Sequence, residues 1–328
     1  MDTILKVENL HVNNKNTQIL KEITFDLKKG EILGIVGESG CGKSTLIRAL
    51  IQMMGKQEEV TKGNIYFKNK DMLKMSPKEI RNLRGKEISV IFQNPGDTLN
   101  PVRTIGKQFI EVLKNHEKIS KKEALKKSMD ILEKVNLKHS ECILNSYPFE
   151  LSGGMKQRVV MALSMIMEPD LLVADEPTSA LDVTVQSQVV KEMMKLRDNF
   201  NTSIVVVTHS MGVVSHMADK VIVMYGGKIV EYGPKEEVLN NPQHPYTKAL
   251  IDAIPKLNGK LPVGIKGSPP NFGLKEEGCS FAPRCKIATK ECFKIHQSLK
   301  YIGNDRFIAC SHMEERVEIY NEQRYIGM

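Results

Sequence analysis

The feature that most constrains this chain is a glycine-rich run from residue 37 to residue 44, which reads Gly-Glu-Ser-Gly-Cys-Gly-Lys-Ser. It follows the apolar segment Glu31–Val36 and precedes Ser44–Met54, a stretch whose composition favours a helix. Glycines allow left-handed backbone angles, so that N–H groups can turn inward around an anion, and the positive end of the following helix adds to the attraction. The pattern predicts a phosphate-binding loop between a strand and a helix.

Contacts to a nucleotide in such a loop come from its backbone and from the start of the helix. Lys43 would place a charge at the β- and γ-phosphates of ATP, and the Ser44 hydroxyl would bind Mg²⁺. The residues of this segment that we expect to contact the nucleotide are Gly37, Glu38, Ser39, Gly40, Cys41, Gly42, Lys43, Ser44 and Thr45.

A second segment carries two adjacent carboxylates. The apolar run Leu171–Asp175 predicts a buried strand that ends in Asp175, and Glu176 follows at once. A carboxylate at a strand end beside a phosphate loop can hold Mg²⁺ directly or through water. Glu176 is then placed to orient or deprotonate the water that attacks the γ-phosphate.

Composition is that of an ordinary globular protein: 328 residues, 41% hydrophobic and 26% charged. No apolar run approaches the about 20 residues that cross a bilayer, and the N-terminus lacks the pattern of a signal peptide, so we expect the chain to stay in the cytoplasm. The formal net charge is +8, but the lysines are dispersed and no RNA-binding signature is present. We therefore expect no nucleic-acid partner.

Short apolar runs rich in Val and Ile predict strands that alternate with helices in the first part of the chain. The predicted strands are Ile4–Val7, Glu31–Val36, Glu87–Phe92, Leu171–Asp175, Ser203–Thr208 and Lys220–Met224. Gly226-Gly227 predicts a tight hairpin between Val221–Tyr225 and Lys228–Glu231. Residues 94–150 favour helices, with a capping box at Ser120 and Glu123.

The run Leu151-Ser152-Gly153-Gly154-Met155-Lys156-Gln157-Arg158 resembles the signature motif of the ATP-binding subunits of ABC transporters. Three further positions fit the same family in order and spacing. Gln93 resembles the Q-loop glutamine, Asp182 the D-loop aspartate, and His209 the switch histidine. The resemblance covers about residues 3 to 250. The family usually has an aromatic ring that stacks on adenine near positions 13–14, where this chain has Asn13 and Asn14, with His11 nearby.

The resemblance implies an α/β fold, namely a P-loop NTPase cassette with a RecA-like core, an antiparallel β part and a helical subdomain. It also implies that two cassettes face head to tail around ATP. Catalysis would then involve Glu176, His209 and Gln93, and Mg²⁺ would be held by Ser44, Gln93 and Asp175. Ser152, Gly153 and Gly154 would close over the γ-phosphate of the partner's nucleotide, and Asp182 of the D-loop is a further nucleotide-binding residue.

Four cysteines, Cys279, Cys285, Cys292 and Cys310, cluster near the C-terminus. In a cytosolic chain such clustering points to metal binding more than to disulfides. The spacing matches neither the usual zinc pairs nor the common ferredoxin runs, so the residues alone leave zinc, an iron–sulfur cluster and unliganded thiols open.

Residues 278–285, Gly-Cys-Ser-Phe-Ala-Pro-Arg-Cys, resemble the C-terminal extension of dipeptide and oligopeptide permease ATPases. Segments 91–102 and 174–185 resemble the D-type subunit of that family. This resemblance implies a 4Fe–4S cluster at the four cysteines, with zinc as the alternative. It divides the chain into a cassette at 1–250, with a helical subdomain at about 94–165, and an extension at 251–328.

The implied function is ATP hydrolysis that drives uptake of di- or oligopeptides. The implied partners are two transmembrane permease subunits, a homologous F-type ATPase subunit and an extracytoplasmic peptide-binding protein; alone, the chain could form a homodimer. The chain would then lie peripherally on the cytoplasmic face of the membrane. The alternatives are a nickel or metallophore importer ATPase of the same subfamily, a soluble ABC ATPase that does not serve transport, and an iron–sulfur regulator that binds ATP without hydrolysing it.

Overall fold

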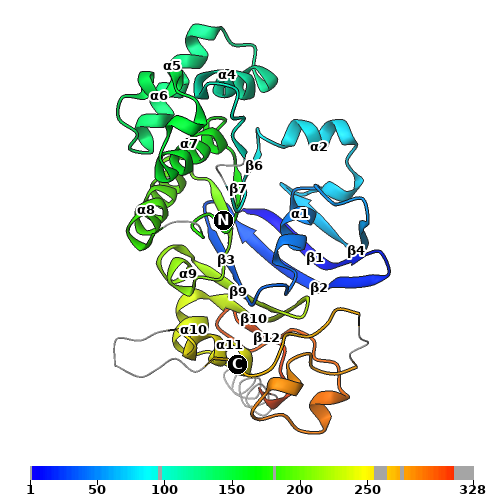
Figure 1. Cartoon of the computed structure of the whole chain (residues 1–328). Helices are drawn as coiled ribbons and strands as arrows, with labels where there is room; N and C mark the ends of the chain where they lie inside the picture. The colour runs from blue at the N-terminus through cyan, green and yellow to red at the C-terminus, as the bar shows by residue number, and fades with distance from the viewer. Residues whose placement is uncertain (1, 95–97, 180–181, 255–263, 274–276, 314–328) are drawn as a thin grey trace, which may run out of the picture. The chain divides into compact units, whose positions relative to one another are not determined.

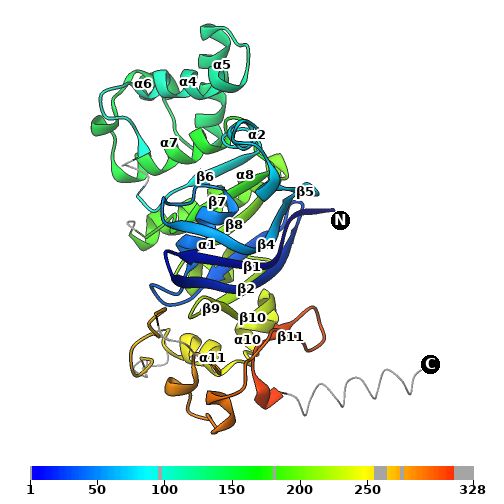
Figure 2. The same cartoon turned by 90° about the vertical axis from the view of Figure 1, so that its right-hand side faces the viewer.

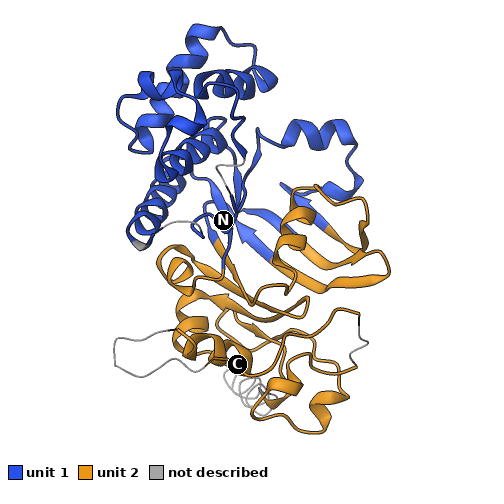
Figure 3. Ribbon diagram, in the orientation of Figure 1, with its two compact units in different colours: residues 1–6, 26–32, 65–208 blue, residues 7–25, 33–64, 209–328 orange. Residues whose placement is uncertain are grey.

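The computed structural model describes residues 2–94, 98–179, 182–254, 264–273 and 277–313 (Figure 1). The chain divides into two compact units (Figure 3). Unit 1 comprises residues 1–6, 26–32 and 65–208, and unit 2 comprises residues 7–25, 33–64 and 209–328. Each unit is therefore assembled from segments that are far apart in the sequence.

A parallel sheet forms the centre of unit 1. Its strands are β6 (Ile88–Ile91), β7 (Leu171–Asp175) and β8 (Ser203–Val207). Ile91 pairs with Ala174, and Asp175 pairs with Val207, so the three strands end at the same edge of the sheet. β8 is buried along its whole length, as expected for a strand covered on both faces.

The helices of unit 1 include a group formed by α4 to α7 (Figure 2). α5 begins at the predicted capping box, in which the Ser120 hydroxyl accepts the Glu123 N–H and the Glu123 carboxylate accepts the Ser120 N–H. The helices of this unit are α2 (Pro77–Leu83), α4 (Ile105–His116), α5 (Lys121–Lys134), α6 (Ser140–Asn145), α7 (Gly153–Met165) and α8 (Val183–Phe200), with 3₁₀ turns at Met72–Lys74 and Pro148–Glu150.

In unit 2, the part of β3 (Ile32–Val36) from Leu33 onward pairs in parallel with β9 (Lys220–Tyr225), which pairs antiparallel with β10 (Lys228–Pro234). Two short strands from the C-terminal part continue this arrangement, because β10 pairs with β12 (Phe307–Ile308) and β12 with β11 (Lys300–Tyr301). The C-terminal part of the chain is thus joined to β10 by backbone pairing.

The helices of unit 2 are short. They are α1 (Lys43–Leu50), α9 (Met211–Met217), α10 (Lys235–Asn240) and α11 (Pro245–Asp252), with 3₁₀ turns at Ala282–Arg284, Glu291–Phe293 and Ser311–Met313. Among the described residues of the chain, no helix has the length and the apolar character needed to cross a bilayer.

A four-stranded sheet completes the fold, with the strand order β2 (Thr17–Lys28), β1 (Thr3–Asn14), β4 (Glu58–Phe67) and β5 (Lys70–Asp71). β4 and β5 pair antiparallel. The first three of these strands carry residues of both units.

All six predicted strands are present, and the hairpin at Gly226-Gly227 is confirmed. Both glycines have positive φ, 53° and 78°, as a two-residue hairpin turn requires. The helix predicted to reach Met54 instead ends at Leu50, because Gln52 adopts a left-handed conformation with φ 53°. β2 and β4 were not among the predicted strands.

Candidate nucleotide site and cysteine pocket

The predicted phosphate loop connects β3 to α1 within unit 2. Gly40 and Gly42 have φ of 78° and 105°, in the left-handed region that favours glycine. A Cβ on Gly42 would lie 2.8 Å from Leu20 Cδ2, the end of a side chain that can shift, so it is the backbone conformation that favours glycine there. The loop therefore has the backbone conformation of an anion cradle.

Lys43 folds back onto this loop. Its Nζ donates to the Gly37 carbonyl at 2.8 Å and to the Glu38 carbonyl at 2.9 Å, and it lies 3.8 Å from Cys41 Sγ. The side chain is buried, whereas Ser44 is exposed at the start of α1. A phosphate oxygen would compete with these carbonyls for the three ammonium donors.

The two carboxylates follow β7 in unit 1. Glu176 has a left-handed backbone, φ 49°, and its N–H donates to the Val207 carbonyl at 2.8 Å. The hydroxyl of Thr208, a buried residue, lies 3.3 Å from Glu176 Oε2 and donates to it. This contact, which the sequence did not predict, holds the Glu176 carboxylate at the edge of the sheet.

Gln93 lies two residues beyond β6 and is exposed. Because β6 and β7 are paired in parallel, Gln93, just beyond β6, and Asp175, the last residue of β7, lie at the same edge of the sheet. The structure thus brings Gln93, Asp175 and Glu176 of unit 1 to one edge of its sheet. His209 is exposed in unit 2, just before Ser210, whose hydroxyl caps α9.

Ser152 and Gly153 are exposed at the N-terminus of α7, where the Ser152 hydroxyl accepts the Met155 N–H. A Cβ added to Gly153 would meet no atom within 4 Å, and one added to Gly154 would make only an ordinary contact. The fold of this chain therefore has no steric need for either glycine. Asp182 accepts the Val185 N–H and caps α8.

The β1 region has no aromatic side chain at positions 13 and 14, where Asn13 is half-buried and Asn14 is exposed. His11 Nε2 donates to Asn9 Oδ1 at 3.0 Å, and Gln18 Nε2 donates to His11 Nδ1 at 2.9 Å. Both ring nitrogens of His11 are therefore engaged by the protein, and burial lowers the pKa of this histidine.

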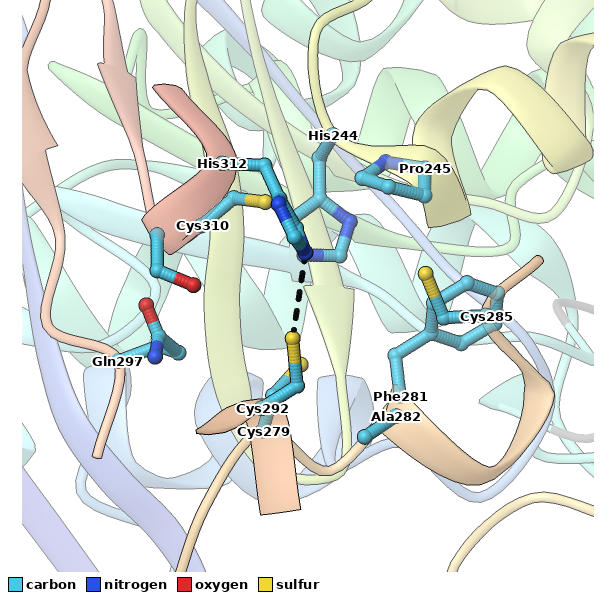
Figure 4. A pocket seen from close by; sticks show the side chains of 11 residues that line it. His244, Pro245, Cys279, Phe281, Ala282, Cys285, Cys292, Gln297, Cys310 and His312 are labelled. Carbon is cyan, nitrogen blue, oxygen red and sulfur yellow. Dashed lines mark hydrogen bonds between the residues drawn. The ribbon is translucent and has the colours of Figure 1, made fainter. Parts of the chain in front are cut away.

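The four clustered cysteines line one pocket of unit 2, together with His244, Phe281 and His312 (Figure 4). Two contacts bring distant parts of the extension together there. The Cys279 N–H donates to the Cys292 carbonyl at 2.7 Å, and Cys292 Sγ lies 3.4 Å from His312 Nε2. The sequence predicted the grouping of the cysteines but not the presence of His312.

The thiols of this pocket differ in acidity. Burial raises the pKa of Cys279 and Cys285 and raises that of Cys310 to about 11. Although burial opposes it, hydrogen bonds from Thr289 and His312 lower the pKa of Cys292. His244 is fully buried, and this burial lowers its pKa to about 3.

Among the described residues, no three His, Cys, Asp or Glu side chains are arranged to hold a metal ion. An iron–sulfur cluster spaces its thiolates over a larger box than one ion does, and a four-thiol lining is the donor set that such a cluster uses. The donor chemistry therefore fits a cluster, while the arrangement gives no support to a single zinc ion.

One further connection joins the cysteine region to the phosphate loop. Arg284, between Cys279 and Cys285, binds the Glu38 carboxylate through both terminal nitrogens, at 2.6 and 3.0 Å. The Tyr246 hydroxyl accepts the Glu38 N–H at 2.8 Å. Tyr246 lies 208 positions from Glu38 in the sequence and Arg284 lies 246 positions away, so no local sequence signal could have paired them with Glu38.

Comparisons with known proteins show which family the chain belongs to. Residues 20–179 match the family described as ABC transporter, and residues 230–292 match the oligopeptide/dipeptide transporter C-terminal region, a range that holds the first three clustered cysteines. The chain is 41% identical over 325 residues to the dipeptide transport ATP-binding protein DppD of Bacillus subtilis, covering 97% of each chain. It is 42% identical over 298 residues to the oligopeptide transport ATP-binding protein OppD of Haemophilus influenzae, covering 89% of this chain and 92% of that one.

Two solved structures share the fold. CbiO1 from Clostridium perfringens, part of the ABC transporter complex cbiONQ, matches with a TM-score of 0.65 and 29% identity, covering 74% of this chain and 92% of that one. The cassette MJ0796, in a dimeric post-hydrolysis state with ADP and Pi, matches with a TM-score of 0.63 and 26% identity, covering 71% of this chain and 99% of that one.

This chain belongs to the ABC transporter family of ATP-binding proteins, in its dipeptide and oligopeptide branch. Its fold is the P-loop ABC cassette, and it is an ABC-type ATPase.

Proposed function

We propose that this chain is the subunit that hydrolyses ATP in an importer of di- or oligopeptides. The observation that carries the proposal is the match over 97% of the chain to a dipeptide transport ATP-binding protein, with the phosphate loop formed between β3 and α1. Residues 230–292 also match the oligopeptide/dipeptide transporter C-terminal region.

ATP would bind at the loop of residues 37–45. Lys43 would exchange its contacts with two loop carbonyls for contacts with phosphate oxygens, at little cost because the ammonium is already desolvated. Glu176 would orient the attacking water, held by its contact with Thr208, and His209 would contact the γ-phosphate.

Mg²⁺ would be held by the Ser44 hydroxyl, Gln93 and Asp175. The residues fit a hard cation, because each offers an oxygen, and Gln93 and Asp175 follow neighbouring parallel strands. The ion would neutralise charge on the phosphates.

The signature segment would act on the nucleotide of a second cassette. Ser152 and Gly153 are exposed at the start of a 13-residue helix, with open space where a Gly153 side chain would be. The N-terminus of this helix carries partial positive charge, and the packing of the chain leaves the space beside it open. Such a place suits a phosphate of the nucleotide that a second cassette binds. Gly154 and Asp182 would contribute to the same interface.

The partners follow from this role. They would be two transmembrane permease subunits, a homologous F-type ATPase subunit and an extracytoplasmic peptide-binding protein, with this chain peripheral on the cytoplasmic side. We assign residues 1–250 to the cassette, about 94–165 to the helical subdomain, and 251–328 to the extension.

The extension would hold a 4Fe–4S cluster through Cys279, Cys285, Cys292 and Cys310. Support comes from the common pocket and from the four-thiol donor set. Such a group would fix loops that have little regular structure of their own. Protein purified without oxygen should contain iron and sulfide, and Cys285→Ser should lose both; Cys142→Ser, at an exposed cysteine outside the pocket, is the control.

The transport function is tested in the assembled complex with its permease subunits in vesicles. Di- and oligopeptides presented with the binding protein should stimulate ATP hydrolysis, and Glu176→Gln should abolish it while MgATP still binds. Stimulation by nickel complexes instead of peptides would identify the metal-importing branch. ATP hydrolysis that neither peptides nor nickel complexes stimulate would refute an importer function. Unchanged turnover in Glu176→Gln would refute the role of Glu176 in orienting the attacking water.

A further inference from the structure

Arg284 connects the cysteine region to the nucleotide-binding loop through an ion pair. Its side chain is 5% exposed and that of Glu38 25%. Besides the bidentate contact with Glu38, Arg284 donates to the Tyr225 hydroxyl at 3.2 Å and to the Lys266 carbonyl at 2.9 Å. The Glu38 hydrogen bonds raise the pKa of the Arg284 guanidinium further, so its charge is permanent.

The same loop residue is held through its backbone. The Tyr246 hydroxyl accepts the Glu38 N–H, and the Tyr246 ring packs against Tyr225 and Phe281, with centroids 4.5 and 5.3 Å away. Phe281 also lines the cysteine pocket. A packed aromatic cluster therefore fixes both contacts to Glu38.

Glu38 in turn contacts the lysine of the loop, because its carbonyl accepts a hydrogen bond from Lys43 Nζ. Any shift of Glu38 moves one of the two carbonyls that position this ammonium. Contacts from the extension thus reach Lys43 through a single intervening residue.

The ion pair also has an electrostatic consequence. Glu38 places a carboxylate in a loop that would bind a triphosphate, and like charges repel more strongly where water is partly excluded. Arg284 cancels this charge with good bidentate geometry. Without a partner, the carboxylate would weaken the binding of an anion to the loop.

We infer that Arg284 is a positioning residue for the nucleotide site, which neutralises Glu38 and thereby allows the loop to bind ATP tightly. The inference rests on the proposed ATP-binding role of residues 37–45. If Arg284 has this role, the C-terminal extension contributes to nucleotide binding, and this contribution does not depend on whether the cysteine pocket holds a cluster.

The test compares ATP dissociation constants of the purified full-length chain by calorimetry. Arg284→Gln should weaken binding about tenfold, and adding Glu38→Gln should restore the affinity to within about threefold of wild type. Lys286→Gln, the same charge change at an exposed neighbour, should bind like wild type. Thermal midpoints and cysteine-pocket iron are measured on each variant, because a merely structural role would lower the midpoint without rescue by Glu38→Gln.

An Arg284→Gln variant that binds ATP like wild type would overturn the inference, and so would a double variant no better than the single one. Should Arg284→Gln not fold, Arg284→Lys keeps the charge but loses the bidentate geometry, and a two- to fivefold weaker affinity is then expected; no change would again overturn it. Failure of the wild-type chain to bind ATP would instead refute the proposed function.

Discussion

At the scale of single residues, glycines in the two glycine-rich segments serve different purposes. Gly42 has φ 105°, a backbone conformation that is strained for any other residue, so the fold of the chain itself favours glycine there. Gly153 has open space around it. A residue that the isolated chain does not need, at an exposed helix start, points to contact with another molecule.

Alanine substitutions separate these two cases. Gly42→Ala should lower stability by about 1–3 kcal/mol and abolish ATP binding, because the loop must distort to accept the methyl group. Gly153→Ala should leave stability and ATP binding of the isolated chain unchanged, yet reduce ATPase turnover of the assembled complex. Urea unfolding, calorimetry and turnover measure the three quantities; full turnover in Gly153→Ala would contradict the signature assignment.

Thr208 gives a second prediction at this scale. Thr208→Val keeps the shape of a buried side chain but removes the hydroxyl that donates to Glu176. We expect the turnover number to fall roughly tenfold, with the KM for ATP within twofold of wild type, because orientation of a catalytic carboxylate is lost while the phosphate loop is untouched. A changed KM with an unchanged turnover number would contradict this role for Thr208.

Residues close together in sequence were predictable, and distant pairs were not. The phosphate loop follows from eight consecutive residues, because one strand–turn–helix contains its whole geometry. The Arg284–Glu38 pair joins residues 246 positions apart, and nothing local to either one indicates the other. Thr208 could have been suspected, since a hydroxyl ends the strand beside the acidic pair.

At the scale of elements, the strands that are buried on both faces were predicted well, because such strands consist of consecutive apolar residues that are easily recognised in the sequence. β2 and β4 carry exposed residues on one side, so their sequences lack such a run. The early end of α1 depends on the left-handed Gln52, which periodicity does not reveal. The pairing of β10 with β12 could not be predicted from the sequence either, because a strand of two residues shows no recognisable pattern.

The cap of α11 gives a pH prediction. His244 Nδ1 accepts the Tyr246 N–H, and its pKa is about 3 in the fold, against about 6.5 when unfolded. Above pH 6.5 the residue is neutral in both states. As pH falls below 6.5, only the unfolded chain binds the proton, so stability should fall, by about 2 kcal/mol from pH 7 to pH 5.

His244→Asn provides the control, because Asn also caps helices but does not titrate. Its stability should be lower than that of wild type at pH 7, yet its loss between pH 7 and pH 5 should be smaller by about 2 kcal/mol. Urea unfolding at the two pH values measures this difference. Equal losses in both proteins would show that His244 is not the titrating group.

At the scale of the whole molecule, the residues that we assign to ATP binding and hydrolysis come from distant parts of the sequence. The phosphate loop and His209 belong to unit 2, whereas Glu176, Gln93 and the signature segment belong to unit 1. A relative of known structure, MJ0796, is described as a dimer with ADP and Pi. MJ0796 shares the fold of this chain at 26% identity. The question for this chain is therefore whether it forms a dimer in solution, with itself or with a homologue.

Glu176→Gln should convert ATP from a transient ligand into a stable link between cassettes, since the bound triphosphate is no longer cleaved. With MgATP, this variant should sediment as a dimer, alone or when mixed with the homologous ATPase subunit proposed above, whereas wild type should remain monomeric after turnover. Glu176→Gln combined with Gly153→Arg should stay monomeric, because a long side chain fills the space at the start of α7 while the phosphate loop still binds ATP. A Glu176→Gln variant that binds MgATP but stays monomeric with and without the proposed homologous subunit would show that the signature segment does not close over a partner's nucleotide.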